Sequence, residues 1–566
     1  MRSGVMKLAI ASFALLGVTA IATEASASSG LETPDSGVYQ GGRGGAWIAR
    51  ADDPLAAYFN PAGLVRQATG VTLGAQLLFL ERCYARTGQD ADQKSETYGQ
   101  YNFPVSPAPG YPGPGSGTNG KAIGPDAAVC QEGHISPVPT LAANFRVLDQ
   151  LAIGLAVVPP HGVGKGIWPE EVGYTNKFGV QSTQPSPQRY MIVGSDSIIL
   201  FPTLSVSYAI NDQLSVGAGF VWGIAHAQFE KYAETLSAPP AVGNVCGPNM
   251  NQPCVAFDDF TRDARAKLSA TDVFVPGFVI GALYSPIKNL DVAGWFRWSD
   301  AVDTDASVNV TANYWDATGK KNADPCSGQP AGCNITPGEK EGDPGYNAGH
   351  IKLAIPMEAK LGVRFHYPRQ DPGPKPSWAT GTKKVRDPMS EDLFDVEADF
   401  TYANNAAVKN IEVRFKPGIA IAGTGGGTLP ENADIAHNWK DVFGARIGGE
   451  AVVLPSRLAA RAGFFYESKG QDDKYLNIDF HMGEKIGLSG GASVRLGPVD
   501  IVVSYQHTWI GTMDNQGKGG LYGLSGDALT AEKPGPAGAY RTYQPINGGK
   551  LTSDLNEVGL GATMRF

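Results

Sequence analysis

The sequence predicts an all-β protein, a fourteen-stranded antiparallel transmembrane β-barrel with a small N-terminal plug and long extracellular loops. Three observations predict this class: an export signal at the N-terminus, a series of segments in which apolar and polar residues alternate, and connections that are short and long in turn. The many Gly (72) and Pro (40) residues fit strands joined by turns. No later run approaches the roughly 18–20 apolar residues of a membrane-spanning helix, which a barrel does not need.

The N-terminus has the order of a cleavable secretory signal. Two basic residues precede an apolar run over residues 8–22, and the small tripeptide Ala25-Ser26-Ala27 follows. We therefore expect residues 1–27 to be removed on export. The whole chain has a formal net charge of −9 and no long basic patch, so nucleic acid is not an expected partner.

Alternating segments begin after residue 69, and their period of two predicts strands with one apolar face. In residues 395–402 the acidic side chains of Asp395, Glu397 and Asp399 share one face. A charged side chain facing lipid at the bilayer midplane costs about 2–4 kcal/mol, so we expect this face to line the lumen. The fourteen segments run approximately over residues 70–83, 138–148, 151–160, 193–210, 213–230, 272–285, 289–312, 351–367, 393–415, 440–454, 456–468, 485–497, 499–509 and 555–566.

The connections differ in length according to their parity. Those after even-numbered strands are mostly short, such as Gly497-Pro498, whereas those after odd-numbered strands are long, such as residues 84–137. This parity is typical of an outer-membrane barrel with short periplasmic turns and long extracellular loops. Residues 368–392 break the rule, and their Pro-rich, charged composition is typical of a disordered periplasmic loop.

Six cysteines lie in or beside the long connections. An exported chain meets an oxidising compartment, so local disulfides are the simplest framework, although other pairings and free thiols stay open as alternatives. The spacing gives no support to a metal site of the Cys-x-x-Cys type, and no metal or cofactor is expected. The expected pairs are Cys83 with Cys130, Cys246 with Cys254, and Cys326 with Cys333.

The Gly-rich stretch over residues 41–63 ends in Asn60-Pro61-Ala62-Gly63. Followed by a series of barrel strands, it resembles the N-terminal hatch of the FadL/TodX family of outer-membrane transporters for long-chain fatty acids and other hydrophobic molecules. The chain is longer than typical members, and no basic residue for a carboxylate head group falls in a matched motif. Other segments that resemble the family are residues 158–162, 201–208, 215–219, 438–441 and 461–464.

The resemblance implies a hatch at residues 28–69 and a barrel at 70–566. An apolar substrate would pass from outer loops to an internal pocket near the hatch, and then sideways through a gap beside the third strand. The hatch residues on this path are Phe59, Asn60, Pro61 and Ala62, and the residues at the lateral opening are Pro159, Pro160 and Gly162. Proline cannot donate a ladder hydrogen bond, so a strand ending at this point must bend or open.

A segment of the third long connection has the spacing of an amphipathic helix. Phe257, Phe260, Ala264 and Leu268 would share one face, with charged residues between them. We interpret Phe257, Phe260 and Leu268 as part of a loop-side entry groove that collects substrate. Packing against a neighbouring loop explains the same pattern equally well.

These features predict passive import of hydrophobic compounds, long-chain fatty acids foremost, by a monomer in the outer membrane of a Gram-negative bacterium. Its only expected partners are the substrate and membrane lipid. A structural or adhesive surface barrel with disulfide-stapled loops and a general porin are the alternatives. An enzyme is disfavoured because the eight His residues are scattered and no Gly-x-Ser-x-Gly elbow occurs.

Overall fold

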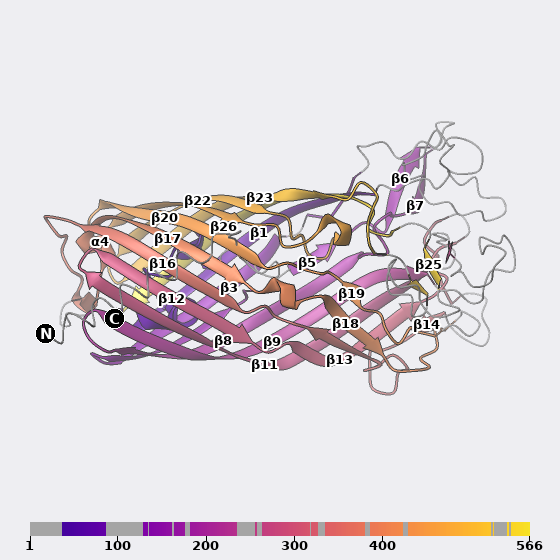
Figure 1. Cartoon of the computed structure of the whole chain (residues 1–566), viewed down its shortest axis with the longest axis horizontal. Coiled ribbons are helices and arrows are strands. Elements are labelled where there is room, and N and C mark those ends of the chain that lie inside the picture. The colour runs from indigo at the N-terminus through magenta and orange to yellow at the C-terminus, as the bar shows by residue number, and fades with distance from the viewer. Residues whose placement is uncertain are drawn as a thin grey trace, which may run out of the picture.

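The strands form a closed antiparallel barrel in which the first strand meets the last (Figure 1). β1 (Gly70–Arg86) pairs with β3 (Ile135–Leu148) on one side and with β26 (Gly549–Arg565) on the other. The predicted fold class is therefore confirmed. The computed structural model describes residues 37–86, 128–133, 135–160, 164–175, 181–234, 255–256, 263–316, 319–326, 334–379, 385–422, 428–521, 524–525, 540–542 and 545–566.

Fourteen strands make the wall, and several are interrupted along their length. After β1 and β3 they are β4 with β5 (Leu151–Val158, Gly164–Ile167), β8 (Gly194–Ala209), β9 (Leu214–Glu234), β11 (Asp263–Ile287), β12 with β13 (Leu290–Ser299, Val302–Thr311), β15 with β16 (Gly349–Leu353, Glu358–Pro368), β17 with β18 (Asp392–Ala403, Asn410–Phe415), β20 (Val442–Leu454), β21 (Leu458–Glu467), β22 (Lys485–Leu496), β23 (Val499–Asp514) and β26.

The remaining elements are short. The strands are β2 (Val129–Cys130), β6 (Glu171–Thr175), β7 (Gln181–Pro185), β10 (Val255–Ala256), β14 (Ile335–Thr336), β19 (Ile435–Ala436), β24 (Leu524–Ser525) and β25 (Tyr540–Thr542). The helices are α2 (Val38–Gly41), α3 (Ala56–Phe59), η1 (Pro61–Arg66), η3 (Ser377–Ala379), α4 (Pro388–Glu391), η4 (Asn405–Ala407) and η5 (Asp473–Tyr475). No helix among the described residues has the length and apolar character needed to cross a bilayer.

The alternation along each strand separates a lipid face from a lumen face. On β17, Val396 and Phe400 are 43% and 40% exposed, while Asp395, Glu397 and Asp399 are buried. The predicted assignment of the acidic face to the lumen is therefore confirmed. The exposed apolar side chains of the other strands form the surface that a bilayer would cover.

The predicted parity of the connections is also confirmed. The short turns lie at the barrel end that holds the C-terminus and α4, and the long outer connections lie at the opposite end (Figure 1). At this outer end β1 and β2 are joined by the predicted disulfide Cys83–Cys130. Cys326 is also disulfide-bonded, but its predicted partner Cys333 lies outside the described residues. Cys246 and Cys254 also lie outside the described residues.

The predicted helix around Leu268 is wrong. Residues 263–270 are the outer part of β11, which pairs with β9 on one side and with β13 on the other. The hydrogen-bond ladders of these neighbours continue beyond the predicted strand start at residue 272, and they outweigh the local helical spacing. Phe257 and Phe260 lie outside the described residues.

The predicted disorder of the connection between β16 and β17 is also corrected by the structure. Its composition predicts disorder, yet residues 369–379 and 385–391 have defined contacts with the barrel. Backbone bonds tie Arg369 to Glu391 and Gly373 to Ser390, both at 2.8–3.0 Å between nitrogen and oxygen. These bonds join the two ends of the segment to each other, and the Arg369 guanidinium also donates to the Val452 carbonyl of β20 at 3.2 Å, so the segment is ordered without a core of its own.

Candidate transport site

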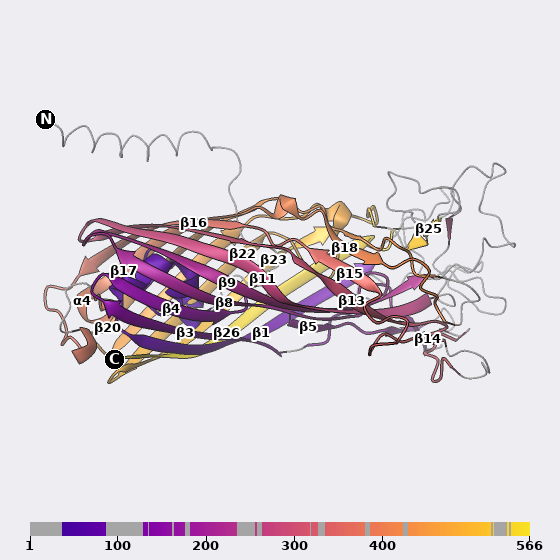
Figure 2. The same cartoon turned by 90° about the horizontal axis from the view of Figure 1, so that it is seen from below.

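The N-terminal residues 37–69, here the plug segment, lie inside the barrel near the end that holds the C-terminus (Figure 2). Their helices pack against different parts of the wall: α2 against β22, β23 and β26, α3 against β4 and β8, and η1 against β8, β9 and β11. Most side chains of the plug segment are buried, including Trp47 and Tyr58 at 1% exposure each. The plug segment thus fills the lumen at this end.

Asn60 organises the turn that ends the plug segment. Its side-chain oxygen accepts a hydrogen bond from the Ala62 N–H at 3.2 Å and caps η1, while its amide group donates to the Ile48 carbonyl at 2.8 Å. Pro61 follows at the first helical position, where a missing N–H costs nothing. Phe59, just before the cap, is half-buried and packs edge-on against Tyr58, with ring centroids 5.0 Å apart.

Two wall glycines let this turn approach the strands closely. A methyl group on Gly217 of β9 would lie 2.5 Å from the Pro61 carbonyl carbon, and one on Gly281 of β11 would overlap the Asn60 side chain. Such contacts are tighter than van der Waals packing allows. The turn can therefore dock in this position only because Gly217 and Gly281 have no side chain.

We expect Gly217→Ala to displace the Asn60–Ala62 turn, because overpacking a tight contact costs about 1–3 kcal/mol. The measurement is hydrogen exchange of the η1 amides, which should become faster in the variant. Gly294→Ala is the control, since a methyl group there meets only a Leu361 side-chain carbon, at 3.5 Å. Unchanged exchange in Gly217→Ala would contradict tight docking.

The acidic face of β17 holds the plug segment through its backbone. The N–H groups of Trp47 and Ile48 donate to one carboxylate oxygen of Asp399 at 2.9 and 3.2 Å. The N–H of Ala49 donates to Glu397 at 2.6 Å. These three hydrogen bonds fix a non-repetitive stretch of chain on a single strand.

Two arginines of the plug segment complete this attachment. Arg43 pairs with Asp395 of β17 at 2.7 Å. Arg50 bridges Asp395 and Glu450 of β20, the latter at 2.7 Å, and both partners are buried. The Tyr39 hydroxyl also donates to Glu450, at 2.7 Å. All these contacts are non-covalent, so the plug segment is held by interactions that can break and re-form.

An apolar cavity of about 190 Å³ opens among the outer ends of the strands. Leu268 lines it together with Phe229, Ile351, Ile411 and Val413, and these side chains belong to or pack on the hydrophobic core that also contains the plug segment. An apolar surface therefore runs from the cavity towards the plug segment.

Lys231 of β9 is the only cation that lines this cavity within the described part of the chain. Among the described residues it forms no ion pair. The other charged lining residue, Asp434, is already paired with Arg414. Sequence reasoning missed Lys231 because the residues that line the cavity are spread along the chain from Tyr190 to Ile546.

The wall is interrupted beside the third strand. Val158 pairs with Phe201 of β8, and Gly164 pairs with Ser197 of β8. Between these two pairs the chain advances by six residues on one side and by only four on β8, so two extra residues are left out of the ladder. Pro159 and Pro160 are buried at the start of this bulge, and Gly162 lies outside the described residues. Residues 135–140 of β3 pair with β1 but with no second strand in the described chain.

Two further prolines lie along this unpaired edge. Pro137 and Pro139 pair in register with Leu77 and Ala75 of β1 although neither has an N–H. In an antiparallel ladder they must therefore occupy the non-hydrogen-bonded positions, where the backbone nitrogen points to the other side. This other side faces the interrupted wall, so the β3 edge has no N–H donor for a neighbouring strand at Pro137 or at Pro139.

No group of three or more His, Cys, Asp or Glu side chains that could hold a metal ion occurs within the described ranges. The described site combines an apolar cavity, a cation, and a charged attachment for the plug segment. These groups can bind and release a molecule.

A closed barrel with a filled lumen and an internal apolar cavity defines a membrane transport protein of the β-barrel class. The chain belongs to the family of outer membrane protein transport proteins (OMPP1/FadL/TodX), whose family model matches residues 18–371. It is therefore a protein of the Gram-negative outer membrane. The family consists of transport proteins rather than enzymes.

Solved structures share the fold. A Pseudomonas aeruginosa FadL homologue has a TM-score of 0.62 at 17% identity, over 94% of this chain and 99% of that one. The Pseudomonas putida toluene transporter TodX has a TM-score of 0.52 at 12% identity, over 95% of this chain and 100% of that one. No curated protein sequence matches the chain. At such identities the two structures support the architecture alone.

Proposed function

We propose that the protein takes up hydrophobic compounds passively across the outer membrane, and that its substrates are amphiphiles with an apolar chain and a carboxylate, such as long-chain fatty acids. The observation that carries this proposal is the cation Lys231 in the wall of an apolar cavity, where it forms no ion pair with any of the described residues. Each buried CH₂ group contributes about 0.8 kcal/mol, so the cavity favours transfer of an alkyl chain from water.

The route that we propose has two steps. The ligand first enters the cavity from the outer loops, and its head group is held by Lys231. The plug segment then shifts on its ion pairs, and the alkyl chain leaves through the interrupted wall beside Pro159 and Pro160. Non-covalent docking of the plug segment and the unpaired edge of β3 support this route.

The test compares two ligands of equal chain length. In Lys231→Met, oleate affinity is expected to fall about 10–100-fold, because a hydrogen bond to a charged group contributes about 1.5–3 kcal/mol. Affinity for oleyl alcohol, which lacks the carboxylate, should change less than about twofold. Binding is measured by fluorescence displacement with purified protein.

Lys267→Met is the matched control, since Lys267 lies beside Leu268 on β11 but does not line the cavity. If oleate affinity is the same in Lys231→Met and in the wild type, the head-group assignment is wrong. If the wild type binds neither ligand, the proposed substrate class is wrong as well.

A neutral aromatic compound is the second candidate. A structural neighbour is a toluene transporter, and a cavity of about 190 Å³ has the size for a single small apolar molecule. Toluene binding that is stronger than oleate binding, and unaffected by Lys231→Met, would favour this candidate.

A further inference from the structure

The long connection between β16 and β17 crosses the mouth of the barrel at the end that holds the C-terminus. Its residues 377–379 and 385–391 are here the strut. On one side, the Arg386 guanidinium binds both carboxylate oxygens of Asp291, at 2.9 and 3.1 Å, and the Ser285 hydroxyl at 3.1 Å. Asp291 is the second residue of β12 and Ser285 lies near the end of β11, so this anchor is on the β11–β12 wall.

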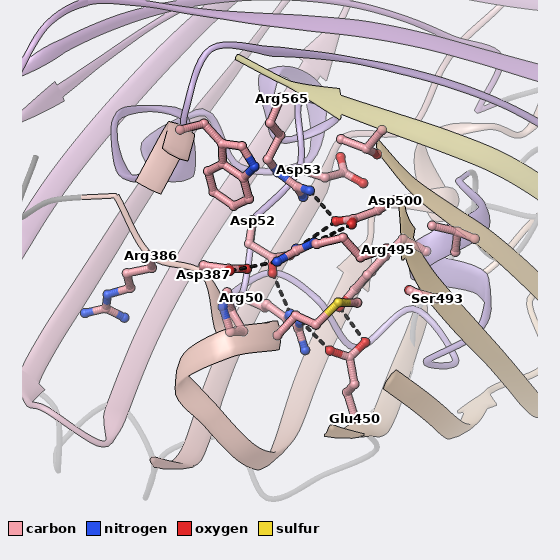
Figure 3. Close-up of a pocket in the computed structure, with 16 residues that line it drawn as sticks. Arg50, Asp52, Asp53, Arg386, Asp387, Glu450, Ser493, Arg495, Asp500 and Arg565 are labelled. Carbon is pink, nitrogen blue, oxygen red and sulfur yellow. Dashed lines mark hydrogen bonds and ion pairs between the residues drawn. The ribbon is translucent and has the colours of Figure 1, made fainter. Parts of the chain in front are cut away.

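The next residue of the strut reaches a different wall. Asp387 pairs with Arg495 of β22 at 2.7 Å, and Arg495 also pairs with Asp500 of β23 at 2.6 Å (Figure 3). Asp500 in turn pairs with Arg565 of β26. The Trp378 ring of the strut lies 5.3 and 5.2 Å from the guanidinium carbons of Arg495 and Arg565.

These two anchors lie across the barrel from each other. In the order of neighbouring strands around the barrel, β12 is followed by β16, β17, β20, β21, β22, β23 and β26. The number of strands between β12 and β26 is the same in both directions around the barrel. Adjacent residues, Arg386 and Asp387, therefore tie the two sides of the mouth together.

The end of the plug segment lies against the strut. The Arg386 N–H donates to the Arg66 carbonyl at 3.1 Å. Ala68 forms a small buried apolar cluster with Ala379 and Val385, and the Trp378 ring packs on it. The last residues of the plug segment before β1 are thus held between the wall and the strut.

We propose that the strut is a positioning element that fixes the C-terminal end of the plug segment and obstructs a straight route from the lumen into the periplasm. This inference rests on the proposed function. It explains why, when the plug segment moves, the substrate leaves through the interrupted wall and does not pass straight into the periplasm. Movement is confined to the part of the plug segment that is attached to β17 and β20.

The test is the double variant Arg386→Gln and Asp387→Asn, which removes both charges and leaves polar side chains in place. Hydrogen exchange of the amides of residues 62–69 is expected to become about tenfold faster. In planar bilayers, the variant should show more frequent ion-conducting openings than the wild type. The matched control is Lys375→Gln with Glu391→Gln, a pair on the same connection whose side chains are 47% and 29% exposed.

Trp378→Ala is the second variant, because it removes the ring contacts to Arg495 and Arg565 without changing charge. A smaller acceleration of exchange, about threefold, is expected here. Wild-type exchange and conductance in a folded double variant would overturn the strut proposal. If the double variant conducts ions but liposomes that contain the wild-type protein take up no oleate, the strut proposal stands and the proposed function fails.

Discussion

Arg50→Ala is expected to release the plug segment from the barrel wall and to give the lumen a measurable ion conductance. The Arg50 guanidinium pairs with Asp52 at 2.8 Å and with two buried wall carboxylates, Asp395 and Glu450. Removing one partner of a buried ion pair leaves the other partner desolvated and costs about 3–5 kcal/mol.

Other partners of the two wall carboxylates reduce this cost. Asp395 keeps Arg43 and Arg364, and Glu450 keeps Arg461. We therefore expect a loss near the lower limit, about 3 kcal/mol, which raises the population of the undocked plug segment roughly 100-fold.

The measurement is single-channel conductance in planar bilayers, combined with hydrogen exchange of the amides of residues 47–49. Lys440→Ala is the control, because its ion pair with Asp472 is on the surface, with side chains 62% and 54% exposed. Arg50→Lys should rescue docking only in part, since one ammonium does not reproduce a forked contact with several carboxylates. Closed channels and wild-type exchange in Arg50→Ala would show that the arginine does not hold the plug segment.

The double variant Pro137→Val and Pro139→Val is expected to abolish most uptake while leaving ligand binding intact. Valine restores an N–H at both positions of the unpaired β3 edge, and it suits a strand surface facing lipid. β5 lies next to this edge, because a methyl group on Gly164 would meet Ser136. New ladder bonds between β3 and the chain before β5 would narrow the gap, and we expect uptake of labelled oleate into liposomes to fall about tenfold or more.

Pro276→Val is the control for this variant. Pro276 lies within β11 at a position paired with Trp222 of β9, just after a β-bulge between Asp272 and Val275 and on a different strand from the β3 edge. Uptake in the control should equal that of the wild type. Wild-type uptake by the Pro137 and Pro139 variant would mean that the substrate leaves by another route, whereas reduced oleate binding would mean that the variant disturbs the cavity.

The fold class could be predicted because its signal is local. A strand with lipid on one side must alternate, so Asp395, Glu397 and Asp399 reveal their lumen face whatever they contact. The same locality misled the interpretation of Leu268. Residues 263–268 alternate Asp, Arg and Lys with Ala, Ala and Leu, but spacing over a longer window also fits a helix.

The candidate site could be predicted only in outline. The motif identifies Asn60 and its neighbours, but it does not reveal how the plug segment is attached, because Arg50 and Glu450 are 400 residues apart in the chain. Lys231 has no local signature, and a lysine on a strand is far more often solvated than placed in an apolar cavity. The predicted second strand begins after Pro137, because a proline weakens any strand prediction.

The sequence by itself determined that the protein is exported, crosses the membrane with strands, directs its charges inward and carries a compact segment before the first strand. Each of these follows from the order of residues within about ten positions. Only the tertiary structure decided which charges hold the plug segment, where the wall is open, and how Arg386 and Asp387 connect two sides of the mouth. The physical reason is that closing the ring brings together residues hundreds of positions apart, and ion pairs and hydrogen bonds act only over a few ångströms.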